Sequence, residues 1–161
     1  VICGHSERRK YFHEDDSLIA LKVLKVLQNN LQPIFCCGET LSQREEKKHK
    51  MVVSEQMEKV LFSLDEEQAQ KVIVAYEPVW AIGTGVNATP EQVQEMHLYI
   101  RELLKKRFGA GISGNISILY GGSVTPENAK SIFPCPDVDG GLVGGASLNA
   151  RDFVNIVKQA E

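Results

Sequence analysis

Five short runs of apolar residues are spaced along the chain, and stretches with helical periodicity separate them. The runs are continuous rather than alternating and are rich in β-branched residues, as is typical of strands that helices bury on both faces. They cover Val1–Cys3, Pro33–Cys37, Val72–Tyr76, Ile116–Tyr120 and Asp139–Val143. The pattern therefore predicts five strands of a single sheet.

Helices are predicted between these runs. The segment Thr89–Gln92 places a capping Thr, a first-turn Pro and a Gln three residues on, which together indicate a helix start. Apolar residues then recur at helical spacing as far as Gly109, which predicts the end of this helix. The segment Thr125–Glu127 starts a shorter helix in the same way. Three more helices are expected over Ser17–Leu27, Met51–Leu61 and Arg151–Gln159.

A strand followed by a helix, repeated five times without a hairpin signal, predicts right-handed βα units and a parallel sheet. The charged run Arg44–Lys50 mixes both signs, so we expect it to form a solvated helix face. No linker or low-complexity tract divides the chain. The 161 residues therefore predict one α/β domain.

Charge and composition exclude several classes of protein. Lys and Arg number 18 against 21 Asp and Glu, a net charge of −3, which argues against nucleic-acid binding by charge. No apolar run approaches the roughly 18–20 residues of a membrane helix, and no signal-peptide pattern opens the chain. The four cysteines lack C-x-x-C spacing. They predict small buried side chains, no metal site and a reducing compartment, the cytoplasm.

Polar and glycine residues follow every predicted strand. In parallel βα proteins, chemistry gathers at this edge of the sheet. The strand ends are Gly4–Glu7, Gly38–Glu39, Glu77–Pro78, Gly121–Ser123 and Gly144–Ser147. The last two combine paired glycines with a hydroxyl, so they predict a nest of backbone N–H groups for phosphate. Taken singly, either glycine pair is equally consistent with an ordinary tight turn.

Glu77 is the sharpest candidate for catalysis. Its carboxylate follows a buried strand, where partial burial raises the pKa and yields a base usable near neutral pH. A salt bridge to a neighbouring Lys is the alternative. The segment Pro78–Ala88 is long for a βα loop, which usually takes about 2–6 residues. Pro78 and Trp80 stiffen its start and Gly83–Gly85 loosen its tip, which predicts a lid over the substrate, with a passive surface loop as the alternative.

His5 lies at the rim of another predicted strand. As a neutral imidazole it suits hydrogen-bond donation to a carbonyl oxygen, and the helix start just beyond it favours the neutral form. Local bonding to the backbone is the other interpretation. A carboxylate base, a neutral imidazole, a phosphate nest and a lid together predict proton abstraction next to the carbonyl of a small phosphorylated substrate.

Five motifs resemble the triosephosphate isomerase family, and they occur in the family's order over the whole chain. The stretch Tyr-Glu-Pro-Val-Trp-Ala-Ile-Gly-Thr-Gly within the third motif is highly specific. The five are Gly4–Arg9, Cys36–Glu39, Ala75–Gly85, Tyr120–Val124 and Leu142–Leu148.

The resemblance implies a (β/α)8 barrel that interconverts dihydroxyacetone phosphate and glyceraldehyde 3-phosphate in glycolysis and gluconeogenesis, with no metal or organic cofactor. It implies that Glu77 is the base and that His5 polarises the carbonyl and stabilises the enediolate. Ser6 would hold Glu77 while the lid is open, and Glu7 would support the edge of the site. The backbone N–H groups implied to bind phosphate belong to Gly83, Ser123, Gly144 and Gly145.

The resemblance also implies structural features, and the sequence departs from the family's pattern at some positions. Arg101 and Asp139 match the family's structural ion pair. Val86–Ala88 stand where many members carry Lys-Thr-Ala. The motifs correspond to strands 4–8 of the barrel, and a barrel of about 250 residues spends roughly 31 on each βα unit, so 161 residues account for five units. The three preceding units would carry an active-site Lys and the loop that docks into the partner subunit.

We therefore expect residues 1–161 to be the C-terminal part of one barrel domain, with a homodimeric intact parent and a nearly inactive isolated chain. The alternative is a non-catalytic fragment that binds phosphate or another protein. A further alternative is a different phosphate-binding barrel enzyme, such as an aldolase or decarboxylase. The lid motif around Glu77, and the lack of a Schiff-base Lys at any strand end, argue against this last possibility.

Overall fold

The strands form one parallel sheet whose spatial order, β1-β2-β3-β4-β5, is the order of the chain. This is seen in a computed structural model, which describes residues 1–160. Each strand lies within a predicted apolar run and is shorter than that run, so the prediction of five parallel strands is confirmed. They are β1 (Ile2–Cys3), β2 (Ile34–Cys37), β3 (Ile73–Tyr76), β4 (Ile118–Tyr120) and β5 (Gly140–Gly141).

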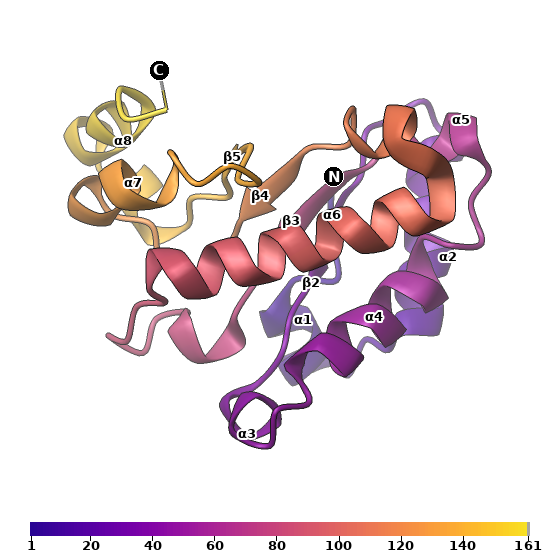
Figure 1. Ribbon diagram of the computed structural model, residues 1–161, viewed down its shortest axis with the longest axis horizontal. Helices are drawn as coiled ribbons and strands as arrows, with labels where there is room; N and C mark the ends of the chain where they lie inside the picture. The colour runs from indigo at the N-terminus through magenta and orange to yellow at the C-terminus, as the bar shows by residue number, and fades with distance from the viewer. Residues whose placement is uncertain (161) are drawn as a thin grey trace.

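Eight α-helices and two short 3₁₀-helices alternate with these strands in residues 1–160 (Figure 1). The α-helices are α1 (Ser6–Phe12), α2 (Asp16–Gln28), α3 (Leu41–Glu45), α4 (His49–Val60), α5 (Glu66–Ala69), α6 (Pro90–Ser113), α7 (Pro126–Ile132) and α8 (Ala150–Val157). The 3₁₀-helices are η1 (Val79–Ala81) and η2 (Gly145–Leu148).

Successive helices pack side by side in the order of the strands they follow. Helix α2 packs against α4, α4 against α6, α6 against α7, and α7 against α8. Because the strand order never reverses and crossovers between parallel strands are right-handed, the helices cover one face of the sheet. All five strands then end at the same edge, so the segments that follow them are brought together there.

The predicted helix starts at Thr89 and Thr125 are confirmed, and both are reciprocal capping boxes. At the first, the Gln92 N–H donates to Thr89 Oγ1 (3.3 Å) and the Thr89 N–H donates to Gln92 Oε1 (2.9 Å). Gly109 breaks the regular helix with φ 82° and ψ 165°, and one further turn extends to Ser113. The predicted break is therefore correct, although the element continues past it.

The prediction for the charged run Arg44–Lys50 is wrong. Helix α3 ends at Glu45, Lys47 takes a left-handed backbone conformation with φ 58°, and α4 begins at His49. The run therefore spans a turn between two helices rather than one helix face. Nor is all of it solvated, because the guanidinium of Arg44 lies 3.2 Å from the fully buried carboxylate of Glu39.

Alternate residues of the central strands pack against the helices. These are Phe35 and Cys37 of β2, Val74 and Tyr76 of β3, and Ile118 and Tyr120 of β4. The four cysteines are free thiols, three of them buried and Cys135 half-buried, close to the prediction of small buried side chains. Across residues 1–160, no group of three potential metal ligands occurs, and no helix is long and apolar enough to cross a membrane.

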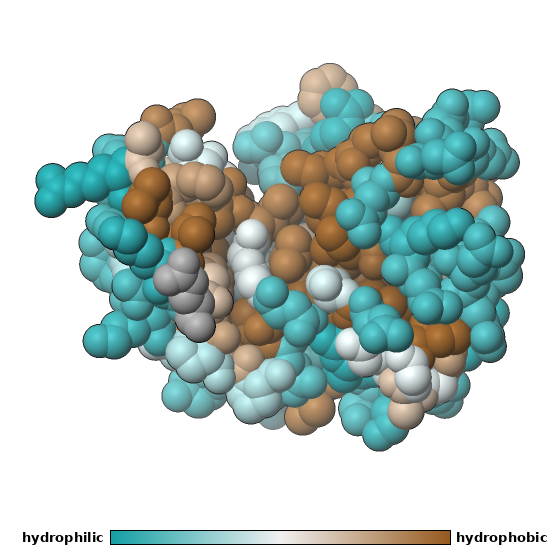
Figure 2. All heavy atoms as spheres, turned by 90° about the horizontal axis from the view of Figure 1, so that it is seen from above, coloured by the Kyte–Doolittle hydropathy of each residue, from teal (hydrophilic) through white to brown (hydrophobic). Residues whose placement is uncertain are grey.

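The sheet has two open edges within residues 1–160, at β1 and β5. Large apolar side chains are exposed on elements at both ends of the sheet. Val1 and Ile2 lie 57% and 48% exposed at β1, and Phe153, Val154 and Val157 lie 41–50% exposed on α8. Figure 2 shows apolar side chains gathered on the face seen from above. Unpaired strand edges with neighbouring apolar surface are positions where further β and α elements pack.

One imidazole lies wholly inside the core. His97 of α6 has no exposed surface, and its Nδ1 lies 3.1 Å from the carbonyl oxygen of Asp137. Burial lowers its pKa to about 4, against the smaller raising effects of the Asp137 carbonyl and of the Asp139 and Asp137 carboxylates. The imidazole is therefore neutral in the folded chain at physiological pH.

This burial makes stability depend on pH. Between pH 6.5 and about 4 the unfolded chain protonates His97 and the folded chain does not. The free energy of unfolding therefore falls as pH drops through that window, by roughly 3 kcal/mol at most. Urea unfolding at pH 7 and pH 4.5 measures this. His97→Phe is expected to lose less stability on acidification than the parent chain. His13→Asn, which replaces an exposed histidine, is the control and should lose as much unfolding free energy between pH 7 and pH 4.5 as the parent chain. Equal losses in the parent and both variants would contradict the assignment of this pH dependence to His97.

Candidate active site

The segments that follow β1, β3, β4 and β5 surround one cavity of about 350 Å³ at the carboxyl edge of the sheet. Six of the eight site residues predicted from sequence line it, namely His5, Glu77, Gly83, Ser123, Gly144 and Gly145. Apolar side chains, including Ile82 and Leu142, complete its wall. The parallel register thus brings residues up to 140 positions apart in the sequence to one site.

Glu77 is the buried acid of this cavity, with 2% of its surface exposed. Its Oε2 accepts a hydrogen bond from the Ser6 backbone N–H (2.9 Å). Its Oε1 lies 3.1 Å from Nε2 of His5 and has no partner with hydrogen-bond geometry within residues 1–160. Burial raises the pKa of Glu77, as predicted, and the nearby His5 and the Ser6 N–H oppose this rise. A carboxylate with a raised pKa and one unsatisfied oxygen is suited to accept a proton.

His5 is fixed by its place at the start of α1, where it is the N-cap residue. Its Nδ1 accepts a hydrogen bond from the Glu7 backbone N–H (3.3 Å). An Nδ1 that accepts cannot also carry the proton, so this bond assigns the proton of the neutral ring to Nε2. The Nε2–H makes no hydrogen bond to Glu77 Oε1 and is therefore free to donate to an oxygen of a ligand bound in the cavity that both residues line.

Ser6 and Glu7, the two predicted supporting residues, contact the site through their backbone. The Ser6 N–H binds Glu77 and the Glu7 N–H binds the His5 ring. The side chain of Glu7 is exposed and does not line the cavity. The helix start of α1 therefore supplies two orienting N–H groups to the acid and the imidazole.

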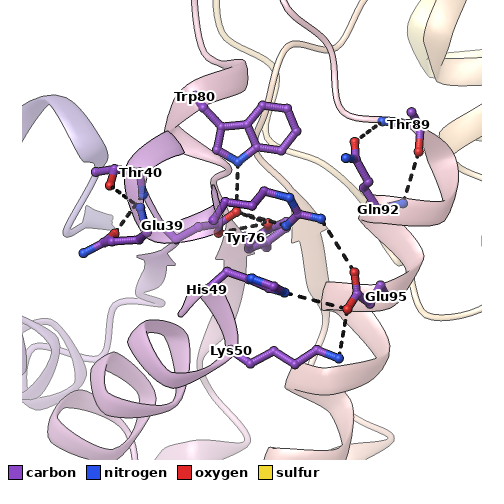
Figure 3. A network of polar contacts seen from close by, with 11 residues as sticks. Glu39, Thr40, His49, Lys50, Tyr76, Trp80, Thr89, Gln92 and Glu95 are labelled. Carbon is purple, nitrogen blue, oxygen red and sulfur yellow. Dashed lines mark hydrogen bonds and ion pairs between the residues drawn. The ribbon is translucent and has the colours of Figure 1, made fainter. Parts of the chain in front are cut away.

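The segment Pro78–Ala88 begins on a firmly held tryptophan. Trp80, in η1, donates its indole N–H to Glu39 Oε1 (2.9 Å). The Tyr76 hydroxyl contacts both oxygens of the same carboxylate (3.1 and 3.0 Å), and Arg44 lies 3.2 Å from it. Figure 3 shows Trp80, Tyr76 and Glu39 pointing toward one another. Sequence reasoning noted Glu39 as a polar strand end but gave no role to it or to Arg44.

The tip of this segment is open. Gly83 and Gly85 take left-handed backbone conformations, with φ 66° and 79°, and a side chain at either position would meet no atom within 4 Å. Within residues 1–160, the side-chain hydrogen bonds of the tip are all local, such as Thr84 Oγ1 to the Trp80 carbonyl (2.7 Å). A lid requires a firmly held first segment, here at Trp80, and an unpacked tip.

The two glycine pairs differ in their surroundings. A Cβ on Gly121 would lie 2.9 Å from Glu77 Cγ, and one on Gly122 would lie 2.2 Å from the Tyr120 hydroxyl. Gly144 and Gly145 have open space instead. The predicted phosphate donor Ser123 gives its N–H to the Ala81 carbonyl of the lid (2.9 Å). In this conformation the Ser123 N–H is therefore already bound within the chain.

The Arg101–Asp139 pair is formed as expected, with Arg101 Nη2 2.6 Å from Asp139 Oδ2. The same oxygen accepts the Ile118 N–H (2.7 Å), and Arg101 also donates to the Ile116 carbonyl (2.6 Å). The pair therefore joins the segments that enter β4 and β5, which supports the strands that carry the glycine pairs.

Fold and site together place the chain in a class of proteins, the α/β barrels whose sites lie at the carboxyl ends of parallel strands, of which five βα units are seen here. Residues 1–160 match the family model for triosephosphate isomerase. The chain belongs to the triosephosphate isomerase family.

Similar proteins agree with this assignment. The chain is 56% identical over 158 residues to a triosephosphate isomerase of Cytophaga hutchinsonii, and 57% identical over 157 residues to one of Flavobacterium johnsoniae. It is 54% identical over 161 residues to one of Chloroherpeton thalassium. These matches cover 98–100% of the chain and 63–64% of each relative. The chain thus spans slightly less than two thirds of the length of these relatives.

Gly38 allows a close contact that positions Glu77. A Cβ at Gly38 would lie 1.8 Å from the Glu77 carbonyl oxygen and 2.6 Å from its carbon. Gly38→Ala is therefore expected to destabilise the fold by about 3 kcal/mol, because strand backbone has to shift. Gly111→Ala is the matched control, since its Cβ would meet nothing within 4 Å, and a gain of up to about 1 kcal/mol is expected there. Chemical denaturation of both variants checks this, and a Gly38→Ala as stable as the parent would contradict the contact.

Proposed function

We propose that this chain carries the catalytic centre of an isomerase that interconverts dihydroxyacetone phosphate and D-glyceraldehyde 3-phosphate, a reaction of glycolysis and gluconeogenesis. One observation carries the proposal. The buried Glu77 keeps an unsatisfied Oε1 at 3.1 Å from His5 Nε2, inside a cavity lined by several glycines. The family membership of residues 1–160 supports the same reaction.

In the proposed mechanism, the Glu77 carboxylate removes a proton from the carbon next to the substrate carbonyl. The electron pair of the broken C–H bond forms a C=C bond to the carbonyl carbon, and the π pair of the carbonyl moves onto its oxygen. The resulting enediolate oxygen accepts a hydrogen bond from His5 Nε2–H. The Glu77 carboxyl then returns the proton to the neighbouring carbon. The proton of the substrate hydroxyl passes from its own oxygen to the former carbonyl oxygen. Atoms and charge therefore balance, and no redox partner is required.

We propose that the phosphate is held by the backbone N–H groups of Gly83, Ser123, Gly144 and Gly145. Open space beside Gly144 and Gly145 supports this assignment, as does the preference of backbone nests for anions. Because the Ser123 N–H is bound to the Ala81 carbonyl, phosphate binding in this proposal requires that N–H to exchange the Ala81 carbonyl for a phosphate oxygen. Ser6 would keep Glu77 oriented while the lid is open, and Glu7 would keep the His5 tautomer.

We further propose that the five βα units are one part of an eight-unit barrel domain and that the complete protein is a cytoplasmic homodimer. The open sheet edges at β1 and β5 and the coverage of 63–64% of the relatives support an incomplete barrel. The exposed Tyr11 and Phe12 of α1, 63% and 65% exposed, support a protein interface beside the site. Free thiols throughout support a reducing compartment.

The 161-residue chain alone is expected to turn over glyceraldehyde 3-phosphate at least on the order of 10³-fold more slowly than the Flavobacterium johnsoniae relative, because an incomplete ring leaves the cavity open to water and lacks part of its electrostatic field. A coupled assay of both proteins measures this. A rate close to that of the relative would contradict the need for further units. Binding of glycerol 3-phosphate without any turnover, even after the chain is joined to the part of the relative that it does not span, would favour a non-catalytic phosphate-binding role.

The role of Glu77 is best tested in a fused protein that joins the chain to the part of the Flavobacterium johnsoniae relative that the chain does not span. Glu77→Gln is expected to lower kcat by roughly 10²–10⁴-fold, because it removes the base, with a small change in KM. Glu102→Gln, on α6 with a side chain 58% exposed, is the control and should leave kcat unchanged. Full activity of Glu77→Gln would overturn the proposed mechanism.

A further inference from the structure

A glutamine of the helix layer, Gln56 of α4, binds the backbone that follows β2. Its Oε1 accepts a hydrogen bond from the Gly38 N–H (2.8 Å), and its Nε2 donates to the Gly38 carbonyl oxygen (3.1 Å). Gln56 does not line the cavity, and its place within the predicted helix Met51–Leu61 gave it no role. One side chain therefore satisfies both polar groups of a glycine that lies beside the proposed base.

The same glycine carries the close contact between β2 and the backbone of Glu77, whose carbonyl oxygen would lie 1.8 Å from a Cβ at Gly38. Backbone hydrogen bonds hold the two segments together on either side of this contact. The Glu77 N–H donates to the Cys37 carbonyl (2.7 Å). The Val79 N–H donates to the Glu39 carbonyl (3.0 Å). The Gly38 peptide therefore sets the backbone of the buried acid and of the first turn of the lid.

Gln56 and Glu77 bind opposite ends of one peptide group. The N–H of Gly38, held by Gln56, and the carbonyl of Cys37, which accepts the Glu77 N–H, belong to the same peptide bond. Because a peptide group is planar and rigid, its two polar ends move together. A rotation that breaks the bond to Gln56 therefore also displaces the acceptor of the Glu77 N–H.

A side-chain amide suits this position because it offers an acceptor oxygen and N–H donors at the same end, whereas a carboxylate only accepts. Gly38 is half-buried, so loss of the amide would let water compete for its N–H and its carbonyl. The peptide would then be free to rotate on the side that faces away from Glu77. The two hydrogen bonds of Gln56 resist this motion.

We propose that Gln56 is a positioning residue for Glu77: its amide fixes the Gly38 peptide, and this peptide fixes the backbone of the acid. The inference rests on the proposed role of Glu77 as the base, and it adds a residue that acts on this base from outside the cavity. Glu77 Oε1 lies 3.1 Å from His5 Nε2. A small displacement of the Glu77 backbone changes this distance directly.

Amide hydrogen exchange of the 161-residue chain, followed by NMR, tests this coupling without substrate. Gln56→Met keeps the length of the side chain and loses both hydrogen bonds. The Glu77 and Val79 amides are then expected to exchange roughly tenfold faster relative to the Gly121 amide. The Gly121 N–H, which binds the Tyr76 carbonyl from the β4 side (2.8 Å), is the internal reference.

Two control variants separate positioning from stability. Gln70→Met makes the same change at an exposed residue, whose Nε2 binds the Glu66 carbonyl (3.3 Å), and should leave the exchange rates unchanged. Val60→Ala trims a buried residue of α4 one turn beyond Gln56, and should leave the ratio of the Glu77 rate to the Gly121 rate unchanged. Unchanged rates in Gln56→Met, or a rise that Gly121 shares equally, would overturn the proposal.

The consequence for catalysis is measured in the fused protein that completes the chain with the Flavobacterium johnsoniae segment. Gln56→Met is expected to lower kcat by roughly 10–100-fold, because Glu77 is misplaced. Little change in KM is expected, because the proposed phosphate-binding groups follow other strands. An unchanged kcat in an active fused protein, or a rise in KM alone, would contradict a positioning role.

The two measurements keep this inference apart from the proposed function. Hydrogen exchange requires no turnover, so it tests Gln56 even if the fused protein is inactive, whereas that inactivity would count against the proposed isomerase. Gln56→Glu replaces Gln56→Met if that variant does not fold. It keeps an acceptor for the Gly38 N–H and loses the donor, so a smaller rise in the Glu77 exchange rate is expected, and no rise would overturn the proposal.

Discussion

The burial of one carboxylate at the carboxyl edge of the sheet, that of Glu77, constrains everything around it. Its backbone leaves no room for a Cβ at Gly38, and its side chain leaves almost none at Gly121. A charge taken out of water needs compensation, and here the helix start of α1 supplies it through the Ser6 N–H and the neighbouring His5 ring. The glycine, the imidazole and the acid are therefore parts of one arrangement.

A second buried acid on the adjacent strand shows what makes Glu77 different. Glu39 receives the Trp80 indole, the Tyr76 hydroxyl and the Arg44 guanidinium, and so it is satisfied and fixes the base of the lid. Within residues 1–160, Glu77 accepts one hydrogen bond, from the Ser6 N–H, and its Oε1 has no hydrogen-bond partner. Two carboxylates at the same edge of the sheet are thus suited to different tasks by the number of donors that surround them.

Much of this arrangement could be predicted from the sequence because strand order and strand ends follow from apolar periodicity. Glu77, His5 and the glycine pairs each lie directly after a strand, and a parallel sheet brings such residues together whatever their separation. The anchor around Glu39, the bond from Ser123 to the lid and the contacts of His97 could not be predicted, because they depend on side-chain directions across elements that no local pattern specifies. The turn at Lys47 was missed because a charged run carries no signal for a left-handed residue.

Burial raises the pKa of the Glu77 carboxyl group and so prepares it as a base, and this pKa can be measured in the folded chain. ¹³C NMR titration of the side-chain carboxyl, assigned by loss of the signal in Glu77→Gln, gives its pKa in the folded chain. A Glu77 pKa above the ordinary 4.5 is expected, because desolvation outweighs the opposing effects of His5 and the Ser6 N–H. A Glu77 pKa at or below 4.5 would contradict it.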